Sequence, residues 1–313
     1  MVQKNSLKKK ILIIGGPTAI GKSSYAIKCA QLFNGEIISA DSMQIYKDMN
    51  IGTGKVTKEE TNNVPHHLID VVLPNENYSA GAFLKDCETK IEEIISRGKL
   101  PIVVGGTGLY INALINGMNF SDTAKSEEVR EKWKKLLSQN GNSYIYEYLQ
   151  KIDPVSAVNI SVNDTKRIIR AIEIYEVTGK PKSKIVTTSE CKYDYLFIIL
   201  TAEREFLYKT INDRVDKMFA DGLFIEAQSL LQYKDNQSMQ AIGYKQIYEF
   251  LDGKYETLEQ TIEEIKKLTR NYAKRQLTFF RGIKAEKYWV FPEEKENTIK
   301  KIELFLSGSQ NGN

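Results

Sequence analysis

The sequence predicts a doubly wound α/β fold with a parallel sheet, an inserted helical domain and a helical C-terminal part. Two observations support this prediction. Short apolar runs alternate with helical stretches through the first third of the chain, as strands and helices do in parallel sheets. Between Phe120 and Tyr193 only helical patterns occur, and a strand-like run then follows. We therefore expect an α/β core in residues 1–119, a helical insertion domain in 120–193, and completion of the core with basic C-terminal helices in 194–313.

Four apolar runs are candidates for buried strands: Ile11–Ile14, Glu36–Ser39, Ile102–Val104 and Leu196–Leu200. Their length and apolar content are typical of parallel strands that are covered on both faces. Residues 23–33 and 82–98, which lie between them, show the apolar spacing of helices. The second of these helices is expected to end at Gly98, because glycine favours helix termination.

The insertion contains three helical stretches, at 126–139, 144–152 and 163–179. The third has Asn163 or Asp164 as its expected N-cap, and Gly179 lies just past its end. From Glu203 onward the chain is again mainly helical.

The bulk composition limits the possible classes of function. The chain has 313 residues and a formal net charge of +4, which is only mildly basic, so a nucleic-acid role must rest on where the charge lies. Cys29, Cys87 and Cys191 are far apart and show neither zinc-site nor disulfide spacing. The N-terminal apolar run is too short for a signal peptide, and no later stretch approaches a membrane span. We expect a cytoplasmic protein with reduced thiols and no membrane association.

A phosphate-binding loop follows the first strand. Its residues fit the pattern G-x-x-x-x-G-K-[ST] and are Gly16, Pro17, Thr18, Ala19, Ile20, Gly21, Lys22 and Ser23. The N–H groups of such a loop, together with the N-terminus of the following helix, bind anions. Lys22 adds a positive charge, and the Ser23 hydroxyl can ligate Mg²⁺. The pattern is typical of ATP-binding, P-loop NTPase-like folds, but it does not itself identify the ligand as ATP.

Polar residues also follow two other predicted strands, at the sheet edge where ligands gather. Asp41 and Ser42 follow the second strand, and the turn Gly105–Gly108, which includes Thr107, follows the third. Asp41 is the only carboxylate directly beyond one of these strands. Three roles remain open for it: Mg²⁺ ligand, general base, or N-cap of a following helix. The glycine-rich turn is either a tight connection or a place where a ligand approaches the backbone.

His66 and His67 suggest a metal site at first sight. Adjacent histidines point to different sides of most backbones, however, and no third ligand stands at helical spacing. We expect a structural or substrate-fitting role for this pair.

Positive charge gathers in two places. Lys166, Arg167 and Arg170 share one face of the helix predicted over 163–179, which is consistent with either a binding surface or a solvated face. The stretch 266–287 holds eight Lys or Arg residues against one acid, with aromatic residues interleaved. Basic side chains follow a phosphodiester backbone and aromatic rings stack on unpaired bases, so RNA is a credible substrate. An amphipathic helix with its aromatics in the core is the alternative.

Seven motifs together resemble the tRNA dimethylallyltransferase family, also called tRNA isopentenyltransferases. They are "GPTAIGKS", "ISADSMQIYKDMNIGTGK", "PHHLIDVVLPNENYSAGAF", "LPIVVGGTGLY", "DTKRIIRAIEIYEVTGK", "AIGYKQ" and "YAKRQLTFFRG". The matches run in order from Gly16 to Gly282, with no departure at the motif positions. The chain ends without the zinc-finger extension of some eukaryotic members, so we expect a bacterial-type enzyme.

The resemblance implies a reaction as well as a fold. Members of the family transfer a dimethylallyl group from dimethylallyl diphosphate to the exocyclic amine of the adenosine 3′-adjacent to the anticodon. The tRNAs concerned read codons that begin with U, and the product is isopentenyladenosine. The P-loop would then hold the diphosphate of the prenyl donor rather than a nucleoside triphosphate, with Mg²⁺ bound at Ser23.

The resemblance also implies roles for particular residues. Lys22 and Arg214 would stabilise the diphosphate, Asp41 would act as the base, and Thr107 would help to place the substrates. Contacts with tRNA would come from Asp41, Ser42, Met43, Gln44, Thr107, Arg130, Lys166, Arg167, Ile168, Ile169 and Arg170. The helical insertion would clamp the anticodon stem, and we expect a monomer because nothing suggests a heptad seam.

Three other functions share some of these features. A P-loop small-molecule kinase would use ATP and direct its acceptor hydroxyl toward Asp41. A prenyltransferase acting on free adenine nucleotides would need neither the insertion nor the basic C-terminal stretch. A non-catalytic RNA-binding module would not need intact Lys22, Ser23 and Asp41.

Overall fold

A computed structural model of the chain describes residues 8–118, 126–185 and 188–308. The chain divides into two units: residues 1–114 with 192–313 form unit 1, and residues 115–191 form unit 2. The sequence predicts a helical insertion at residues 120–193, and unit 2 of the structure spans Ile115–Cys191.

Unit 1 is built on a six-stranded, fully parallel sheet in the order β3-β2-β4-β1-β5-β6. The strands are β1 (Lys10–Gly15), β2 (Gly35–Ser39), β3 (His66–His67), β4 (Leu100–Gly105), β5 (Asp194–Leu200) and β6 (Tyr288–Val290). The four strands predicted from apolar runs are all present. β3 and β6 were not predicted, because two- and three-residue edge strands carry no periodic signal.

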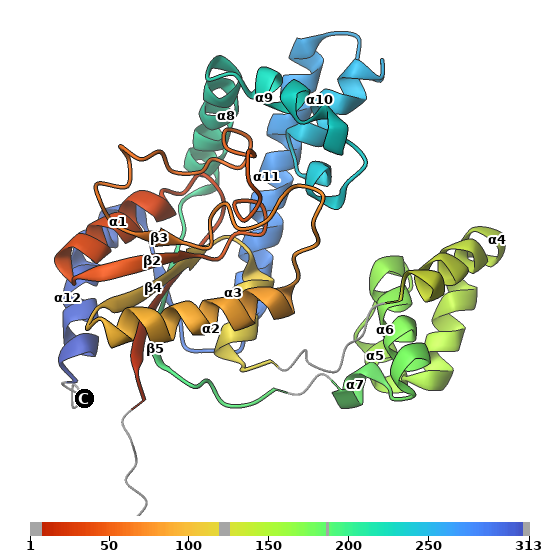
Figure 1. Cartoon of the computed structure of the whole chain (residues 1–313), viewed down its shortest axis with the longest axis horizontal. Coiled ribbons are helices and arrows are strands. Elements are labelled where there is room, and N and C mark those ends of the chain that lie inside the picture. Colours follow the sequence, from red (N-terminus) through yellow and green to blue (C-terminus); the bar gives the residue numbers. More distant parts are fainter. Residues whose placement is uncertain (1–7, 119–125, 186–187, 309–313) are drawn as a thin grey trace, which may run out of the picture. The chain divides into compact units, whose positions relative to one another are not determined.

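Helices cover both faces of this sheet. The helices of unit 1 are α1 (Lys22–Leu32), α2 (Ala80–Ser96), α3 (Gly108–Ile115), α8 (Arg204–Ala220), α9 (Leu223–Ser229), α10 (Tyr244–Leu251), α11 (Leu258–Gly282) and α12 (Lys295–Ser307). α1 and α2 lie on opposite sides of the sheet (Figure 1). Leu12 and Ile14 pack with Tyr25 and Ala26 of α1. Alternate residues of a strand point to opposite faces, so the fully buried Ile13 faces the other layer.

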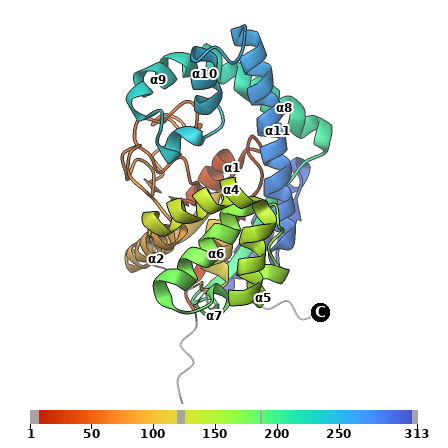
Figure 2. The ribbon, with the colours of Figure 1, turned by 90° about the vertical axis from the view of Figure 1, so that its right-hand side faces the viewer.

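The long helix α11 connects the sheet with a group of helices formed by α8, α9 and α10 (Figures 1 and 2). Near its middle, Arg270 donates to Asn212 Oδ1 of α8 at 2.7 Å. Near its end, the ring of Phe280 is fully buried against Phe197 of β5. Gln276 lies between these two points, and its bonds to Thr18 and Gly106 place this part of α11 beside the ends of the strands.

Unit 2 is helical, and consists of α4 (Glu127–Ile152), α5 (Pro154–Val158), α6 (Thr165–Thr178) and α7 (Lys182–Ile185). α4 consists of two helical segments on either side of Gly141, whose backbone is not helical (φ 79°, ψ 179°), as the two stretches predicted at 126–139 and 144–152 indicate. Asp164 is the N-cap of α6 and accepts from Arg167 N–H, and Gly179 ends the helix with φ 69°. Trp133, Ile145, Ile168 and Ile172 belong to the core of this unit.

Within the described residues, no helix combines the length and the apolar character needed to cross a membrane.

Candidate active site

The P-loop joins β1 to α1 through backbone conformations that favour glycine. Gly16 has φ 146° and Gly21 has φ 81°, and Gly21 caps α1 without a side-chain hydrogen bond. The first N–H groups of α1 are therefore left for an anion. Lys22 lies at the start of the helix and its Nζ donates to Pro17 O at 2.6 Å. The loop thus has the geometry of a phosphate cradle, with the ammonium held against its backbone.

Asp41 lies directly after β2, but residues 42–45 form a turn rather than the start of a helix. Asp41 Oδ1 accepts from Met43 N at 2.9 Å and from Gln44 N at 3.4 Å. The interpretation of Asp41 as the N-cap of a helix is therefore wrong, because its carboxylate stabilises a turn and no helix follows it directly. These two bonds occupy one oxygen and fix the direction of the side chain at the sheet edge.

Thr107 ties the turn after β4 to the Asp41 turn. Its Oγ1 accepts from Ser42 N at 2.9 Å, and its own N–H donates to Ala40 O at 3.2 Å. The hydroxyl also lies 3.3 Å from Ser42 Oγ. The structure therefore brings together Thr107 and the segment 41–44, which the sequence assigned to one site.

Gln276 of α11 links two of the loops and was not predicted as a site residue. Its Oε1 accepts from Thr18 N of the P-loop at 2.9 Å, and its Nε2 donates to Gly106 O at 2.9 Å. The side chain is buried and occupies the same helix stripe as Ala273 and Phe280. A polar residue in an otherwise apolar stripe was the available sequence signal.

Opposite charges meet at this edge of the sheet. Loss of water around Lys22, opposed by the attraction of Asp41 and assisted by the nearby charge of Arg214, lowers the pKa of its ammonium to about 8. Burial also lowers the pKa of Arg214, which lies in α8, while Asp41 and Glu60 act to raise it. Burial and the Asp41 charge raise the pKa of Tyr272 in α11. Two cations, one carboxylate and one phenol therefore share an electrostatic environment.

Magnesium fits this arrangement only in the manner of a phosphate-bound ion. Among the described residues, no group of three or more His, Cys, Asp or Glu could hold a metal. The Ser23 hydroxyl has no hydrogen-bond partner within the same residues. Mg²⁺ is commonly held by one or two protein oxygens together with substrate phosphates and water. Ser23 with a bound diphosphate matches that donor set.

The two histidines have structural surroundings. His67 Nε2 lies 2.7 Å from Glu36 Oε2, and Arg97 and Lys99 pair with the same carboxylate. These contacts lower the pKa of Glu36 to about 2, against the desolvation that raises it. His66 Nδ1 lies 2.8 Å from Val64 O. Glu36 is at the start of β2, so this cluster lies at the opposite end of that strand from Asp41.

The basic residues of unit 2 form a cluster around a buried carboxylate. Glu173 Oε1 accepts from Arg130 Nε at 3.0 Å, and Oε2 accepts from Arg170 Nη1 at 2.6 Å. Lys166 and Arg167 are exposed on the same helix, and Arg167 and Arg170 contribute to the lowered pKa of Lys182, after desolvation. The tRNA contacts that the resemblance implies for the two isoleucines of this helix are corrected by their burial. Ile168 and Ile169 are buried in the core of unit 2, so we expect no side-chain contact between them and RNA.

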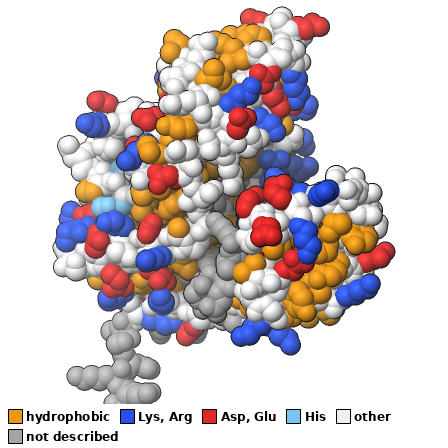
Figure 3. Space-filling view, turned by 45° about the vertical axis from the view of Figure 1, so that its right-hand side comes forward, with side chains coloured by type: hydrophobic (Ala, Val, Ile, Leu, Met, Phe, Trp, Pro, Cys, Tyr) orange, Lys and Arg blue, Asp and Glu red, His pale blue; other side chains and the backbone are white. Residues whose placement is uncertain are grey.

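The basic stretch on α11 is partly neutralised within unit 1. Lys266 pairs with Asp216 and Glu263, and Lys267 pairs with Glu264. The exposed residues on the later turns include Lys274, Arg275, Thr278, Phe279 and Arg281. We call them the α11 stripe. Phe279 is 38% exposed and its ring lies against Gly108, beside Thr107. On the face that Figure 3 shows, Lys and Arg are interspersed with Asp and Glu within each unit.

Comparisons of sequence identify the relatives of this chain. The model of a family described as IPP transferase matches residues 44–283. A relative from Caldanaerobacter subterraneus subsp. tengcongensis, named tRNA dimethylallyltransferase, is 50% identical over 96% of this chain and 98% of its own length. A relative of the same name from Carboxydothermus hydrogenoformans is 47% identical over 96% of this chain and 97% of its own length.

Solved structures give the same grouping. The full-length tRNA isopentenylpyrophosphate transferase of Bacillus halodurans has a TM-score of 0.70 at 43% identity, with 96% of each chain covered. A eukaryotic dimethylallyltransferase, captured acting on tRNA, has a TM-score of 0.80 at 34% identity. That match covers 96% of this chain and 80% of the other.

Proposed function

The chain belongs to the IPP transferase family and transfers a dimethylallyl group to tRNA, and we propose that the site described above carries out this transfer. The donor in this proposal is dimethylallyl diphosphate, with its diphosphate in the P-loop. The acceptor is the exocyclic amine of the adenosine 3′-adjacent to the anticodon, in tRNAs that read codons beginning with U.

One observation supports the proposal above all others: three loops at the carboxyl edge of the sheet are held together by side chains. Gln276 joins the P-loop to the turn after β4, and Thr107 joins that turn to the Asp41 turn. A phosphate cradle and a carboxylate therefore have a fixed relationship. Such a relationship is required for transfer from a diphosphate to an amine that loses a proton as the new bond forms.

The chemistry makes separate demands on the cations and on the carboxylate. The adenine amine is a weak nucleophile because its lone pair is delocalised into the ring. As its nitrogen bonds to the allylic carbon, the carbon–oxygen bond to the diphosphate breaks and the electron pair leaves with the diphosphate. Lys22, Arg214 and the loop N–H groups would stabilise that departing charge. Asp41 would take the proton that the amine loses.

Ser23 would hold Mg²⁺ against the diphosphate, and the ion when bound supplies further neutralisation of the leaving group. The target base has to leave its stack to reach Asp41, as in other enzymes that modify bases. Phe279 of the α11 stripe lies against Gly108, beside Thr107, and the exposed Phe279 and Arg275 suit contact with an unstacked strand. The basic cluster of unit 2 would bind the anticodon stem as a clamp. We propose further that the enzyme works as a cytoplasmic monomer.

The variant Asp41→Asn tests the catalytic part of the proposal. Asparagine retains an oxygen that can accept from Met43 N–H, so the turn should persist. It cannot take a proton as a carboxylate does. We expect a near-native melting temperature and retained binding of dimethylallyl diphosphate. Single-turnover transfer to tRNA should fall by about 10²–10⁴-fold, the usual contribution of a general base.

Asp48→Asn is a matched control, because Asp48 is exposed and lies in the segment after the Asp41 turn. It should transfer the prenyl group at close to the wild-type rate. Near-normal transfer by Asp41→Asn would remove Asp41 from the mechanism and leave it only the role of stabilising its turn.

A further inference from the structure

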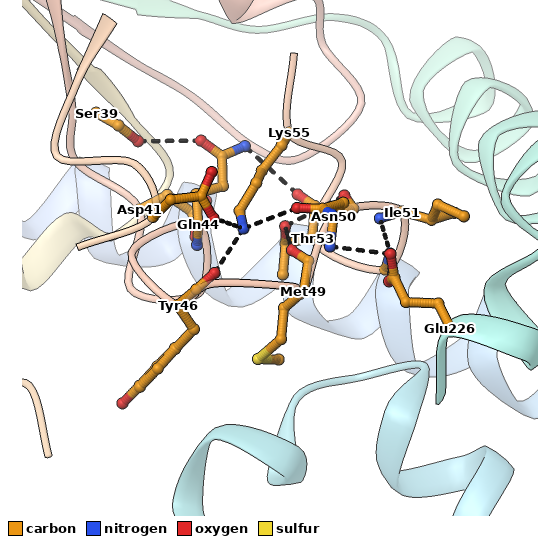
Figure 4. Close-up of polar contacts among 12 residues, drawn as sticks. Ser39, Asp41, Gln44, Tyr46, Met49, Asn50, Ile51, Thr53, Lys55 and Glu226 are labelled. Carbon is orange, nitrogen blue, oxygen red and sulfur yellow. Dashed lines mark hydrogen bonds and ion pairs between the residues drawn. The ribbon is translucent and has the colours of Figure 1, made fainter. Parts of the chain in front are cut away.

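Glu226, on the short helix α9, is not among the site residues described above, and its carboxylate accepts four hydrogen bonds. Three come from consecutive backbone N–H groups: Asn50 and Ile51 donate to Oε2 at 3.0 and 2.8 Å, and Gly52 donates to Oε1 at 3.0 Å. The fourth comes from the hydroxyl of Tyr244 at 2.5 Å. Figure 4 shows the Glu226 carboxylate against residues 50 and 51 of this segment.

The segment that Glu226 binds, residues 49–54, is a tight loop. Gly54 N donates to Ile51 O at 2.9 Å, and Lys55 N donates to Asn50 O at 3.0 Å. The Thr53 hydroxyl donates to Met49 O at 2.6 Å. Because these bonds close the loop on itself, fixing residues 50–52 also fixes Gly54.

The far side of the 49–54 loop faces the proposed active site. Gln44 Nε2 lies 3.2 Å from Gly54 O, and Gln44 Oε1 accepts from Ser39 Oγ at the end of β2 at 3.0 Å (Figure 4). Arg214 packs directly on Gly54: a Cβ added there would lie 1.8 Å from its Nη2. The 49–54 loop therefore contacts both Gln44, which belongs to the Asp41 turn, and Arg214, the second cation proposed to bind the diphosphate.

Packing against Gly54 contributes to the position of Arg214. Within residues 8–118, 126–185 and 188–308, its guanidinium has no hydrogen bond or ion pair, and Asp41 and Glu60 act on it only as nearby charges. Its direction therefore depends on the surface that Gly54 presents together with these charges. Gly52 is constrained in a similar way, since a Cβ there would lie 2.5 Å from the ring of the fully buried Tyr244.

We infer that Glu226 is a positioning residue for the transfer reaction: with Tyr244, it fixes the 49–54 loop and so aims the Arg214 guanidinium at the donor diphosphate. This inference rests on the proposed function, in which Arg214 binds that diphosphate. Glu226 itself contacts neither substrate. Its carboxylate occupies the loop's backbone donors as an internal anion.

The test is a double-mutant cycle with inorganic pyrophosphate as the probe, using the full chain with Mg²⁺ and calorimetry. Glu226→Gln sets an amide N–H₂ against backbone donors and should weaken pyrophosphate binding by about tenfold. Arg214→Ala should weaken it by about tenfold or more, as loss of a charge-assisted contact does. In the Arg214→Ala background, Glu226→Gln should change affinity by less than about twofold.

Two further variants separate positioning from general stability. Tyr244→Phe removes one hydroxyl donor to Glu226 and should give a smaller loss that also disappears without Arg214. Glu249→Gln is the matched control: Glu249, on α10, pairs with Lys254 and accepts from Tyr255, away from the loop. It should lower the melting temperature without changing pyrophosphate affinity.

The outcomes distinguish the positioning role of Glu226 from the diphosphate-binding role of Arg214. Equal losses for Glu226→Gln with and without Arg214, or no loss in either background, would overturn the inference while leaving the proposed function intact. Unchanged affinity in Arg214→Ala alone would contradict the proposed role of Arg214, and the inference would fall with it.

Discussion

Lys22 is subject to opposing electrostatic effects in the candidate site. Its ammonium is desolvated near Arg214, and its attraction to Asp41 only partly compensates, so its pKa falls to about 8. In the free protein it donates to Pro17 O. A bound diphosphate would supply the opposite charge that the site lacks and would hold Lys22 protonated.

This environment predicts a pH dependence of donor binding. Below about pH 8 Lys22 is charged in the free protein, so affinity should be nearly constant. As pH rises through about 8, the free enzyme loses that proton and has to regain it on binding. The dissociation constant for dimethylallyl diphosphate should then increase, by up to about tenfold per pH unit. The diphosphate itself is fully ionised there, since phosphate groups lose their last proton near about pH 6.

Calorimetry in buffers of different ionisation enthalpy would measure the proton uptake directly. Lys22→Arg provides the comparison, because a guanidinium stays charged throughout this range. That variant should show a flat profile from pH 7.5 to about 9.5, whatever its absolute affinity. A wild-type profile as flat as that of Lys22→Arg would show that Lys22 does not titrate near pH 8.

Among the elements, α6 has an apolar face and a basic face. Ile168 and Ile172 pack into the core of unit 2, while Lys166 and Arg167 are exposed. Buried Glu173 holds Arg130 and Arg170 in place, and these contacts lower its pKa against the desolvation that raises it. The cluster is therefore an ordered set of cations from two helices, which suits a rigid RNA stem.

Replacing Lys166, Arg167 and Arg170 with Ala should weaken tRNA binding and flatten its salt dependence. Fewer counterions are released when fewer phosphates are neutralised, so the slope of log K against log salt should decrease in magnitude by about two. Binding of dimethylallyl diphosphate should hardly change. The measurement is tRNA affinity over a series of salt concentrations.

A control of equal charge is the variant with Lys209, Lys217 and Lys300 replaced by Ala, since all three are exposed in unit 1. It should retain most of the affinity and the slope. If both triple variants lose the same amount, net charge alone governs binding and the α6 face is only solvated.

The elements also show how far the sequence could predict the structure. Buried strands such as Ile11–Ile14 were recognisable because runs covered on both faces are continuously apolar. β3 and β6 were not, since strands of two and three residues are fixed by pairing with β2 and β5 rather than by pattern. The two helices predicted at 126–139 and 144–152 correspond to the two helical segments of α4, because the non-helical backbone of Gly141 (φ 79°, ψ 179°) separates them.

The residues of the candidate site could be predicted from the sequence only where they belong to a local motif or follow a recognisable strand. The P-loop and Asp41 follow strands, so their place at the sheet edge was derived from order along the chain. Gln276 and Glu226 act through bonds to loops far away in sequence. Such contacts depend on tertiary packing, so no spacing rule could identify them.

At the scale of the whole molecule, the parallel sheet explains why one chain can combine these parts. β1, β2 and β4 are neighbours in the sheet, so their following loops meet at one edge. α8 and α11 then add Arg214, Tyr272 and Gln276 to that edge. Unit 2 is inserted between β4 and β5 and supplies a separate basic surface.

Binding of the diphosphate of a dimethylallyl donor by the P-loop is the step on which the proposed reaction depends. The most direct measurement is the melting temperature of the full chain with Mg²⁺ and either dimethylallyl diphosphate or ATP, repeated for Lys22→Ala. Ligand at a hundred times its dissociation constant stabilises a protein by about 2.7 kcal/mol. We expect clear stabilisation by dimethylallyl diphosphate, much less by ATP, and loss of the effect in Lys22→Ala. Stronger stabilisation by ATP, accompanied by ATP hydrolysis without tRNA, would contradict the account.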